Sequence, residues 1–132
     1  MTSNSERRSV ILVIADEEET RHGIKRLLRA GGYQVDTAKN EEEADLYTGA
    51  HRPDLILMSL SLDAVEALTV MRRIRQRSGL GEEVPVVGFC GAGLDEGAEV
   101  GLGSNVYLTW PDNFDQLRDL LSRLLLKPLS PG

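Results

Sequence analysis

The sequence has 132 residues, 41% of them hydrophobic, which suffices for one domain around one buried core. Its 21 acidic and 15 basic residues give a net charge of −6, and no cluster of Lys and Arg alternates with aromatic residues, so no direct nucleic-acid partner is expected. The single cysteine excludes an internal disulfide, and no apolar run is long enough for a signal peptide or a membrane span, so we expect a cytoplasmic protein without a membrane partner.

Apolar and amphipathic segments alternate along the chain. The apolar segments predict strands at residues 9–16, 33–38, 55–59, 84–90 and 106–110. Apolar residues at helical spacing predict helices at residues 17–32, 40–52, 64–79 and 113–127. The glycine-rich segment between the last two strands predicts a further helix, short and distorted, within residues 91–104.

This alternation predicts an α/β fold. Strands that alternate with helices of this length form a doubly wound, five-stranded parallel sheet, a flavodoxin-like (βα)5 three-layer sandwich. We expect this domain at residues 9–127, after a flexible lead-in at 1–8 and before a C-terminal tail at 128–132. On the helix expected after the third strand, the inward face should consist of Val65, Leu68, Met71 and Ile74.

Four short motifs lie at the strands and the loops that follow them. They are VILVIADEE at 10–18, PDLILMS at 53–59, VPVVGFCG at 84–91 and YLTWP at 107–111. In this order and at this spacing they resemble the receiver domain of response regulators, the CheY-like, phosphorylatable half of bacterial two-component systems. The resemblance covers nearly all of residues 9–127, and it implies a role in phosphorelay signal transduction.

The resemblance also implies a pocket for phosphotransfer. In a working receiver, a carboxylate accepts a phosphoryl group from a phosphohistidine, and neighbouring carboxylates hold a divalent cation. A lysine and a Thr or Ser hydroxyl contact the phosphoryl oxygens. The matching positions in this chain are Ala15, Asp16, Glu17, Ser59, Cys90, Trp110 and Pro111.

Most of these positions depart from the family's pattern. Ser59 stands where the family has its phosphoacceptor, and Ala15 stands at the first acid of the metal-binding pair. Cys90 replaces the hydroxyl and Trp110 replaces the lysine, so that Asp16 alone matches among these chemical positions.

These substitutions should abolish phosphotransfer. A serine hydroxyl without a base is a poor nucleophile, and losing one electrostatic stabiliser commonly costs about 10²–10³ in rate. We therefore predict a degenerate pseudo-receiver that is not an enzyme and needs no cofactor. Mg²⁺ binding should be weak or absent, with Asp16 and Glu17 as weak candidate ligands.

Two alternatives remain open. In the first, Asp63 accepts the phosphoryl group in an atypical active receiver, although a loop acid or a helix cap is the simpler interpretation of that residue. Asp54 is excluded from this role, because it lies at the opposite end of the strand, roughly 16 Å from Ser59. In the second alternative, the vacated pocket beside Trp110 binds a small ligand, and the domain is a sensor.

Other features have both a functional and a structural interpretation. Cys90 is a candidate redox site, but a lone cysteine at the end of a buried strand more often fills space. GAGLDEG at 91–97 has the spacing of a loosened dinucleotide-binding turn, but its acidic residues would repel a pyrophosphate. His22 and His51 lie in helical patterns without a further metal ligand at useful spacing, so we expect both at the surface.

The expected partner is a protein. In the family, the fourth helix, fifth strand and fifth helix form a face that commonly docks a partner or a second copy. In this chain that face comprises residues 94–103, Tyr107 and the outer side of 112–127. Tyr107 stands at the family's aromatic switch position, with plain packing as the other interpretation. Trp110 either fills the vacated anion pocket or anchors a partner at its rim.

Overall fold

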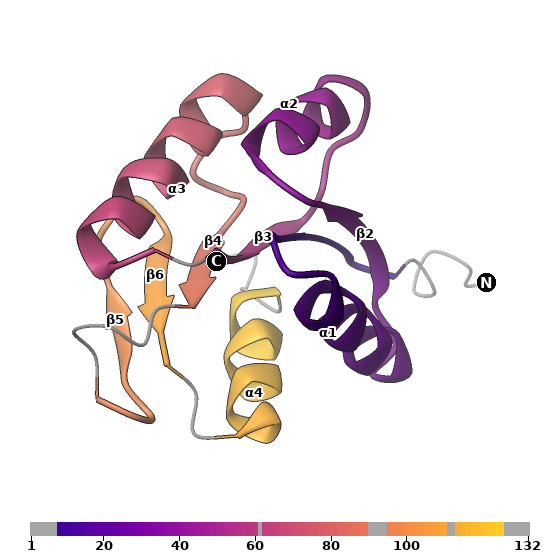
Figure 1. Cartoon of the computed structure of the whole chain (residues 1–132), viewed down its shortest axis with the longest axis vertical. Coiled ribbons are helices and arrows are strands. Elements are labelled where there is room, and N and C mark those ends of the chain that lie inside the picture. Colours follow the sequence, from indigo (N-terminus) through magenta and orange to yellow (C-terminus); the bar gives the residue numbers. More distant parts are fainter. Residues whose placement is uncertain (1–7, 61, 90–94, 111–112, 126–132) are drawn as a thin grey trace, which may run out of the picture.

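The computed structural model of the chain describes residues 8–60, 62–89, 95–110 and 113–125 (Figure 1). The helices in these ranges are α1 (Glu18–Ala30), α2 (Glu41–Ala50), α3 (Ala64–Ser78) and α4 (Phe114–Leu125). The strands are β1 (Val10–Ala15), β2 (Gln34–Ala38), β3 (Leu55–Ser59), β4 (Val86–Phe89), β5 (Glu99–Gly101) and β6 (Val106–Thr109).

All the strands belong to one sheet with the order β2-β1-β3-β4-β6-β5. Neighbouring strands run parallel, except that β5 pairs antiparallel with β6 at one edge. The order reverses direction after β2, as it does in a doubly wound sheet. The predicted flavodoxin-like α/β class is therefore confirmed.

Helices cover both faces of the sheet (Figure 1). α2 and α3 lie over one face, and α1 and α4 lie over the other. Because side chains of a strand alternate between the two faces, β1 sends Leu12 and Ile14 toward one helix layer, and Ile11 and Val13 toward the other. All four side chains are fully buried, which explains why the strand is apolar at every position.

The prediction of a helix within 91–104 was wrong for the described part of that segment, which contains β5. The sheet therefore has six strands and not five. A turn joins β5 to β6, and the Val106 amide closes it by donating to the Gly103 carbonyl at 3.1 Å. The central residues Ser104 and Asn105 have φ angles of 56° and 63°, the left-handed backbone that tight hairpin turns require. Turn chemistry thus places an antiparallel strand where a helix was expected.

The inward face of α3 also differs from the prediction. Val65 is 76% exposed, whereas Ala67, Met71 and Ile74 are buried against the sheet. These three residues follow helical spacing, so the stripe is regular but begins two positions later than expected. Leu68 is half-buried at the border of this stripe.

The ends of the chain limit what the structure describes. The predicted tail at 128–132 and most of the lead-in at 1–8 lie outside the described residues. The first described residue, Arg8, is exposed, and β1 begins shortly after it at Val10. Within the described ranges, no helix combines the length and the apolar character needed to cross a membrane.

Candidate functional site at the carboxyl edge of the sheet

The ends of β1 and β3 form the centre of the candidate site. Ala15 and Ser59 are the last residues of these strands, and the parallel register pairs them, about 4.8 Å apart. Ala15 is fully buried and Ser59 is half-buried. A methyl group and a hydroxyl group therefore stand at the sheet edge where the resemblance places carboxylates.

Arg21 adds a positive charge to this edge. It projects from the first turns of α1, and its Nη1 donates a hydrogen bond to the Ala15 carbonyl at 3.0 Å. The guanidinium of arginine stays charged at any physiological pH. A fixed cation therefore lies beside the first of the predicted metal-binding positions.

Two acids remain near this edge. Asp16 and Glu17 are both exposed, and they occupy the short connection from β1 to α1. Glu17 Oε1 accepts a hydrogen bond from the Thr20 hydroxyl at 3.1 Å. No group of three or more His, Cys, Asp or Glu residues suited to a metal occurs in the described part of the chain. The assignment of Asp16 and Glu17 as weak metal ligands stays a prediction.

Asp63 is engaged at the start of α3. Its Oδ1 accepts a hydrogen bond from the Glu66 amide at 2.8 Å, and Glu66 Oε1 accepts one from the Asp63 amide at 3.4 Å. This reciprocal pair is a capping box, so the helix-cap interpretation of Asp63 is confirmed. Asp54 accepts a hydrogen bond from the Val10 amide at 2.7 Å, at the amino end of both strands and therefore remote from Ser59.

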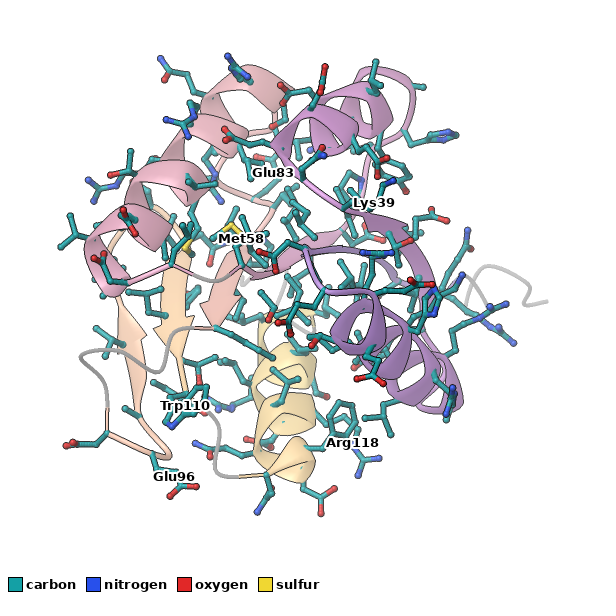
Figure 2. All side chains as sticks on the ribbon, in the orientation of Figure 1. Lys39, Met58, Glu83, Glu96, Trp110 and Arg118 are labelled. Atoms are coloured by element: carbon teal, nitrogen blue, oxygen red, sulfur yellow. The ribbon has the colours of Figure 1, made fainter. Side chains whose placement is uncertain are left out.

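Trp110 directly follows β6 and is 42% exposed. Its amide donates to the Ala98 carbonyl at 3.1 Å, and its carbonyl accepts from the Gly97 amide at 2.6 Å. Figure 2 shows Trp110 near Glu96, at the open end of the β5–β6 hairpin and away from its turn. Of the two interpretations of this residue, partner contact at the rim fits the exposed side chain better than complete filling of the pocket.

Tyr107 is fixed within the β5–β6 hairpin. Its hydroxyl donates to Asn105 Oδ1 at 2.9 Å, and Asn105 Nδ2 donates to the Glu82 carbonyl at 2.7 Å. Its ring lies across Gly101 on the neighbouring strand, where an added Cβ would be 3.6 Å from the ring. Packing therefore accounts for this half-buried ring, and its role as a switch stays a prediction.

The remaining predicted positions divide into two groups. His22 and His51 are exposed, as expected. Cys90, Pro111 and the glycine-rich residues 91–94 lie outside the described residues, so what was expected of them stays a prediction. In residues 95–103, the described part of the glycine-rich segment of the predicted docking face, the structure has β5 and no helix.

The family model for the response regulator receiver domain matches residues 11–122, a span that contains every described strand except the first residue of β1. The chain belongs to the response regulator receiver domain family. It is therefore a receiver domain of the kind found in two-component systems, as the four sequence motifs indicated.

The relatives of this receiver domain include a transcriptional regulator and a response regulator of known structure. The virulence transcriptional regulatory protein PhoP of Salmonella typhimurium is 30% identical over 115 residues, which cover 87% of this chain and 51% of PhoP. The chain thus spans about half the length of the curated relatives that it matches. The response regulator TrrA of Thermotoga maritima, solved with Mg²⁺ and BeF, has a TM-score of 0.65 at 25% identity, and the match covers 88% of this chain and 98% of TrrA.

A second structure shows TrrA in complex with the histidine kinase ThkA. Its match to this receiver domain has a TM-score of 0.68 at 25% identity and covers 89% of this chain and 98% of that chain. A two-component response regulator from Clostridium difficile, at 21% identity, has a TM-score of 0.69 over 93% of this chain and all of that one, which supports the fold.

Sequence reasoning missed Arg21 as part of the site. It is separated from Ala15 by an exposed loop, and nothing in its helical pattern distinguishes it from the other basic residues of α1. The contact depends on how α1 folds back over β1, which only the structure shows.

Proposed function

We propose that this receiver domain has lost the phosphoacceptor chemistry of its family and acts through phosphorylation-independent contacts with other proteins. Its pathway is of the two-component or phosphorelay type, and its partner is a signalling protein or a second copy. The domain is a pseudo-receiver that catalyses no reaction and needs no cofactor.

The ends of β1 and β3 carry this proposal. The methyl of Ala15, the hydroxyl of Ser59 and the guanidinium of Arg21 surround the place where phosphotransfer needs carboxylates and a metal ion. A guanidinium repels a divalent cation, and near a protein surface this repulsion is substantial over short distances. The chain's own cation thus opposes the metal that the reaction requires.

The proposed docking surface is built from β5, β6 and α4. Trp110 is exposed at the end of β6, and tryptophan is a frequent anchor at protein interfaces. Because the hairpin is fixed by its own turn and by Tyr107, this surface needs no phosphate to order it. Binding at this surface is therefore constitutive or is controlled by another signal.

Trp110 is the only tryptophan of the chain, which makes it a convenient reporter of this site. We expect its fluorescence to stay flat when the folded protein is titrated with MgCl₂ and then with beryllofluoride, an acyl-phosphate mimic. A saturable response to Mg²⁺ that beryllofluoride strengthens would refute the proposal. Isothermal titration with MgCl₂ provides a second measurement that does not depend on the position of the indole.

A restored variant supplies the positive control. Ala15→Asp with Ser59→Asp returns two acids to the strand ends, and Arg21→Ala removes the opposing cation. This triple variant should bind Mg²⁺, whereas Ala15→Asp with Ser59→Asp alone should bind it more weakly because Arg21 then pairs with the new acids. Equal Mg²⁺ binding by the wild type and the triple variant would show that the native site already suffices.

A further inference from the structure

Four basic residues share one face of α1. They are His22, Lys25, Arg26 and Arg29, at helix positions i, i+3, i+4 and i+7, and here they are named the basic α1 face. In the described part of the chain, these four residues line a surface hollow of about 340 Å³. Figure 2 shows nitrogen-tipped side chains that project outward on this side of the molecule.

A second hollow extends this surface over the edge strand β2. It measures about 430 Å³, and its lining includes Lys25 and Arg29 again, together with Arg8. Asp36 also lines it, but its carboxylate already accepts a hydrogen bond from the Tyr47 hydroxyl at 2.6 Å. The two hollows together form a cationic surface on a protein whose net charge is −6.

The fold itself does not use these cations. Ion pairs between described residues involve other basic side chains, namely Lys39, Arg52, Arg73, Arg77, Arg118 and Arg123. Like charges at i,i+4, such as Lys25 and Arg29, destabilise a helix by about 0.2–0.5 kcal/mol per pair. Arg29 lies in the last turn, where the helix dipole favours it, but Lys25 and Arg26 lie too far from the end to benefit.

The basic α1 face is also separate from the candidate site. α1 starts at the carboxyl edge of the sheet and runs back along it, so Arg29 lies toward the amino edge, where it shares a hollow with Arg8 and Gln34. Ala15 and Ser59 end their strands at the opposite edge. A partner at this face therefore leaves the ends of β1 and β3 uncovered.

The chemistry of this surface fits carboxylates arranged on a helix. The cations Lys25, Arg26 and Arg29 lie within about 6 Å along α1, and His22 precedes them by one turn on the same face; acids on one face of a second helix reproduce this spacing. A long polyphosphate fits less well, because it would extend past the basic α1 face onto the surface of a protein with a net charge of −6. Tyr33 is the one aromatic residue that lines either hollow in the described part of the chain, so base stacking has little support.

We propose that the basic α1 face docks an acidic helix of a partner protein. This inference rests on the proposed function, in which the domain acts by contact with other proteins. It adds which surface of the domain makes one such contact and which charge the partner carries there. A receiver domain with this surface and a hairpin surface on the other side holds two proteins at once.

A synthetic acidic helix tests this proposal on the full chain. The probe is a fluorescein-labelled peptide of about 20 residues with Glu at i, i+4 and i+7 on an Ala-rich background. Fluorescence anisotropy should show saturable binding that weakens as NaCl is raised. Lys25→Glu with Arg29→Glu should lower the affinity at least about tenfold, and because neither side chain has an ion pair in the described structure, the variant should fold normally by circular dichroism.

A control variant separates the local surface from total charge. Lys39→Glu with Arg72→Glu changes the net charge equally, and both side chains are exposed outside the basic α1 face. Because salt screens charges that lie away from the bound peptide, this control should change the affinity for the peptide by less than about twofold. The proposal is overturned if both variants bind alike or if the wild type does not bind the peptide.

Two further probes decide the class of partner. Duplex DNA and vesicles that contain phosphatidylserine are titrated against the same three proteins. Tighter binding of either probe than of the peptide, with loss in Lys25→Glu/Arg29→Glu, would overturn the assignment to an acidic helix. These results are independent of the Mg²⁺ titration, so failure of the proposed function and failure of this docking surface are distinguishable.

Discussion

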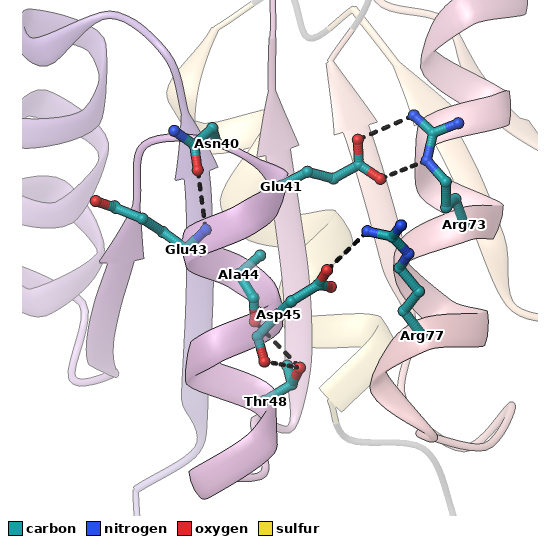
Figure 3. A network of polar contacts seen from close by, with 8 residues as sticks. All are labelled: Asn40, Glu41, Glu43, Ala44, Asp45, Thr48, Arg73 and Arg77. Atoms are coloured by element: carbon teal, nitrogen blue, oxygen red, sulfur yellow. Dashed lines mark hydrogen bonds and ion pairs between the residues drawn. The ribbon is translucent and has the colours of Figure 1, made fainter.

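Two helix surfaces of this receiver domain are rich in arginine, and they use it differently. Between α2 and α3, Glu41 accepts hydrogen bonds from Arg73 at 2.5 and 2.9 Å, and Asp45 accepts one from Arg77 at 2.9 Å (Figure 3). On the basic α1 face, no cation forms an ion pair with another described residue. The first surface joins two helices, and the second one faces solvent.

The difference shows how to separate structural charges from charges available to a partner. A structural cation has an acid within reach on a neighbouring element, as Arg73 has in Glu41, and hydrogen bonds from Arg73 hold the pKa of that carboxyl below its usual value. A cation without such an acid contributes little to folding. Where several such cations cluster, we infer that they bind another molecule.

The largest expected effect is a loss of stability on the α2–α3 side, from a substitution that pushes α3 away from the sheet. Gly88 lies in β4 beneath α3, and an added Cβ would be 2.7 Å from Met71 Sδ and 3.2 Å from Leu108 Cδ2. Gly88→Ala therefore overpacks a buried contact and should lower the free energy of unfolding by about 1–3 kcal/mol, measured in urea. Peptide binding at the basic α1 face, across the sheet, should stay within about twofold. An unchanged unfolding free energy would show that Met71 moves aside without cost.

Charge reversal on the two surfaces compares them directly. Arg73→Glu places a like charge against Glu41 and should lower the free energy of unfolding measurably, since it loses a bidentate pair and adds repulsion. Arg26→Glu removes a cation that has no pair and should change stability by less than about 0.5 kcal/mol. Equal losses in the two variants would mean that the surfaces do not differ in the way proposed.

The smallest expected effect is on the pH dependence of stability. Because Arg73 lowers the pKa of Glu41 in the folded chain, the unfolded chain binds more protons just below the usual value of 4.5. The contribution of this pair is therefore fully present above that pH and is lost as the pH falls through the lowered pKa. The difference in unfolding free energy between wild type and Arg73→Ala should shrink over this interval, whereas Arg26→Ala should show no such trend.

Most of the fold was predictable, because its strands and helices have unambiguous periods. The run through Leu55 and Leu57 has apolar residues at every position, as a strand covered on both faces must have. The face of α3 was less predictable, since Ala67 packs against the sheet although Val65 is the more hydrophobic residue. Packing geometry, and not side-chain hydrophobicity alone, decided which residue lies inward.

The hairpin and the site show what pattern reasoning lacks. β5 is only three residues long, too short to display a period, but the turn residues Gly103, Ser104 and Asn105 before an apolar run are a usable signal of a hairpin. The strand-end residues Ala15 and Ser59 were placed correctly by their motifs, whereas their proposed loss of chemistry stays a prediction.

The β5–β6 hairpin also bears on the order of folding. Gly101 and Tyr107, which it pairs, are near neighbours in sequence, whereas Ile11 of β1 pairs with Leu55 of β3 across a helix, a strand and a second helix. A hairpin closes in about 1–10 μs, while parallel pairs wait for their crossover to form. We therefore expect β6 to join the growing sheet with its outer edge already occupied by β5, so that only its inner edge is free to pair with β4.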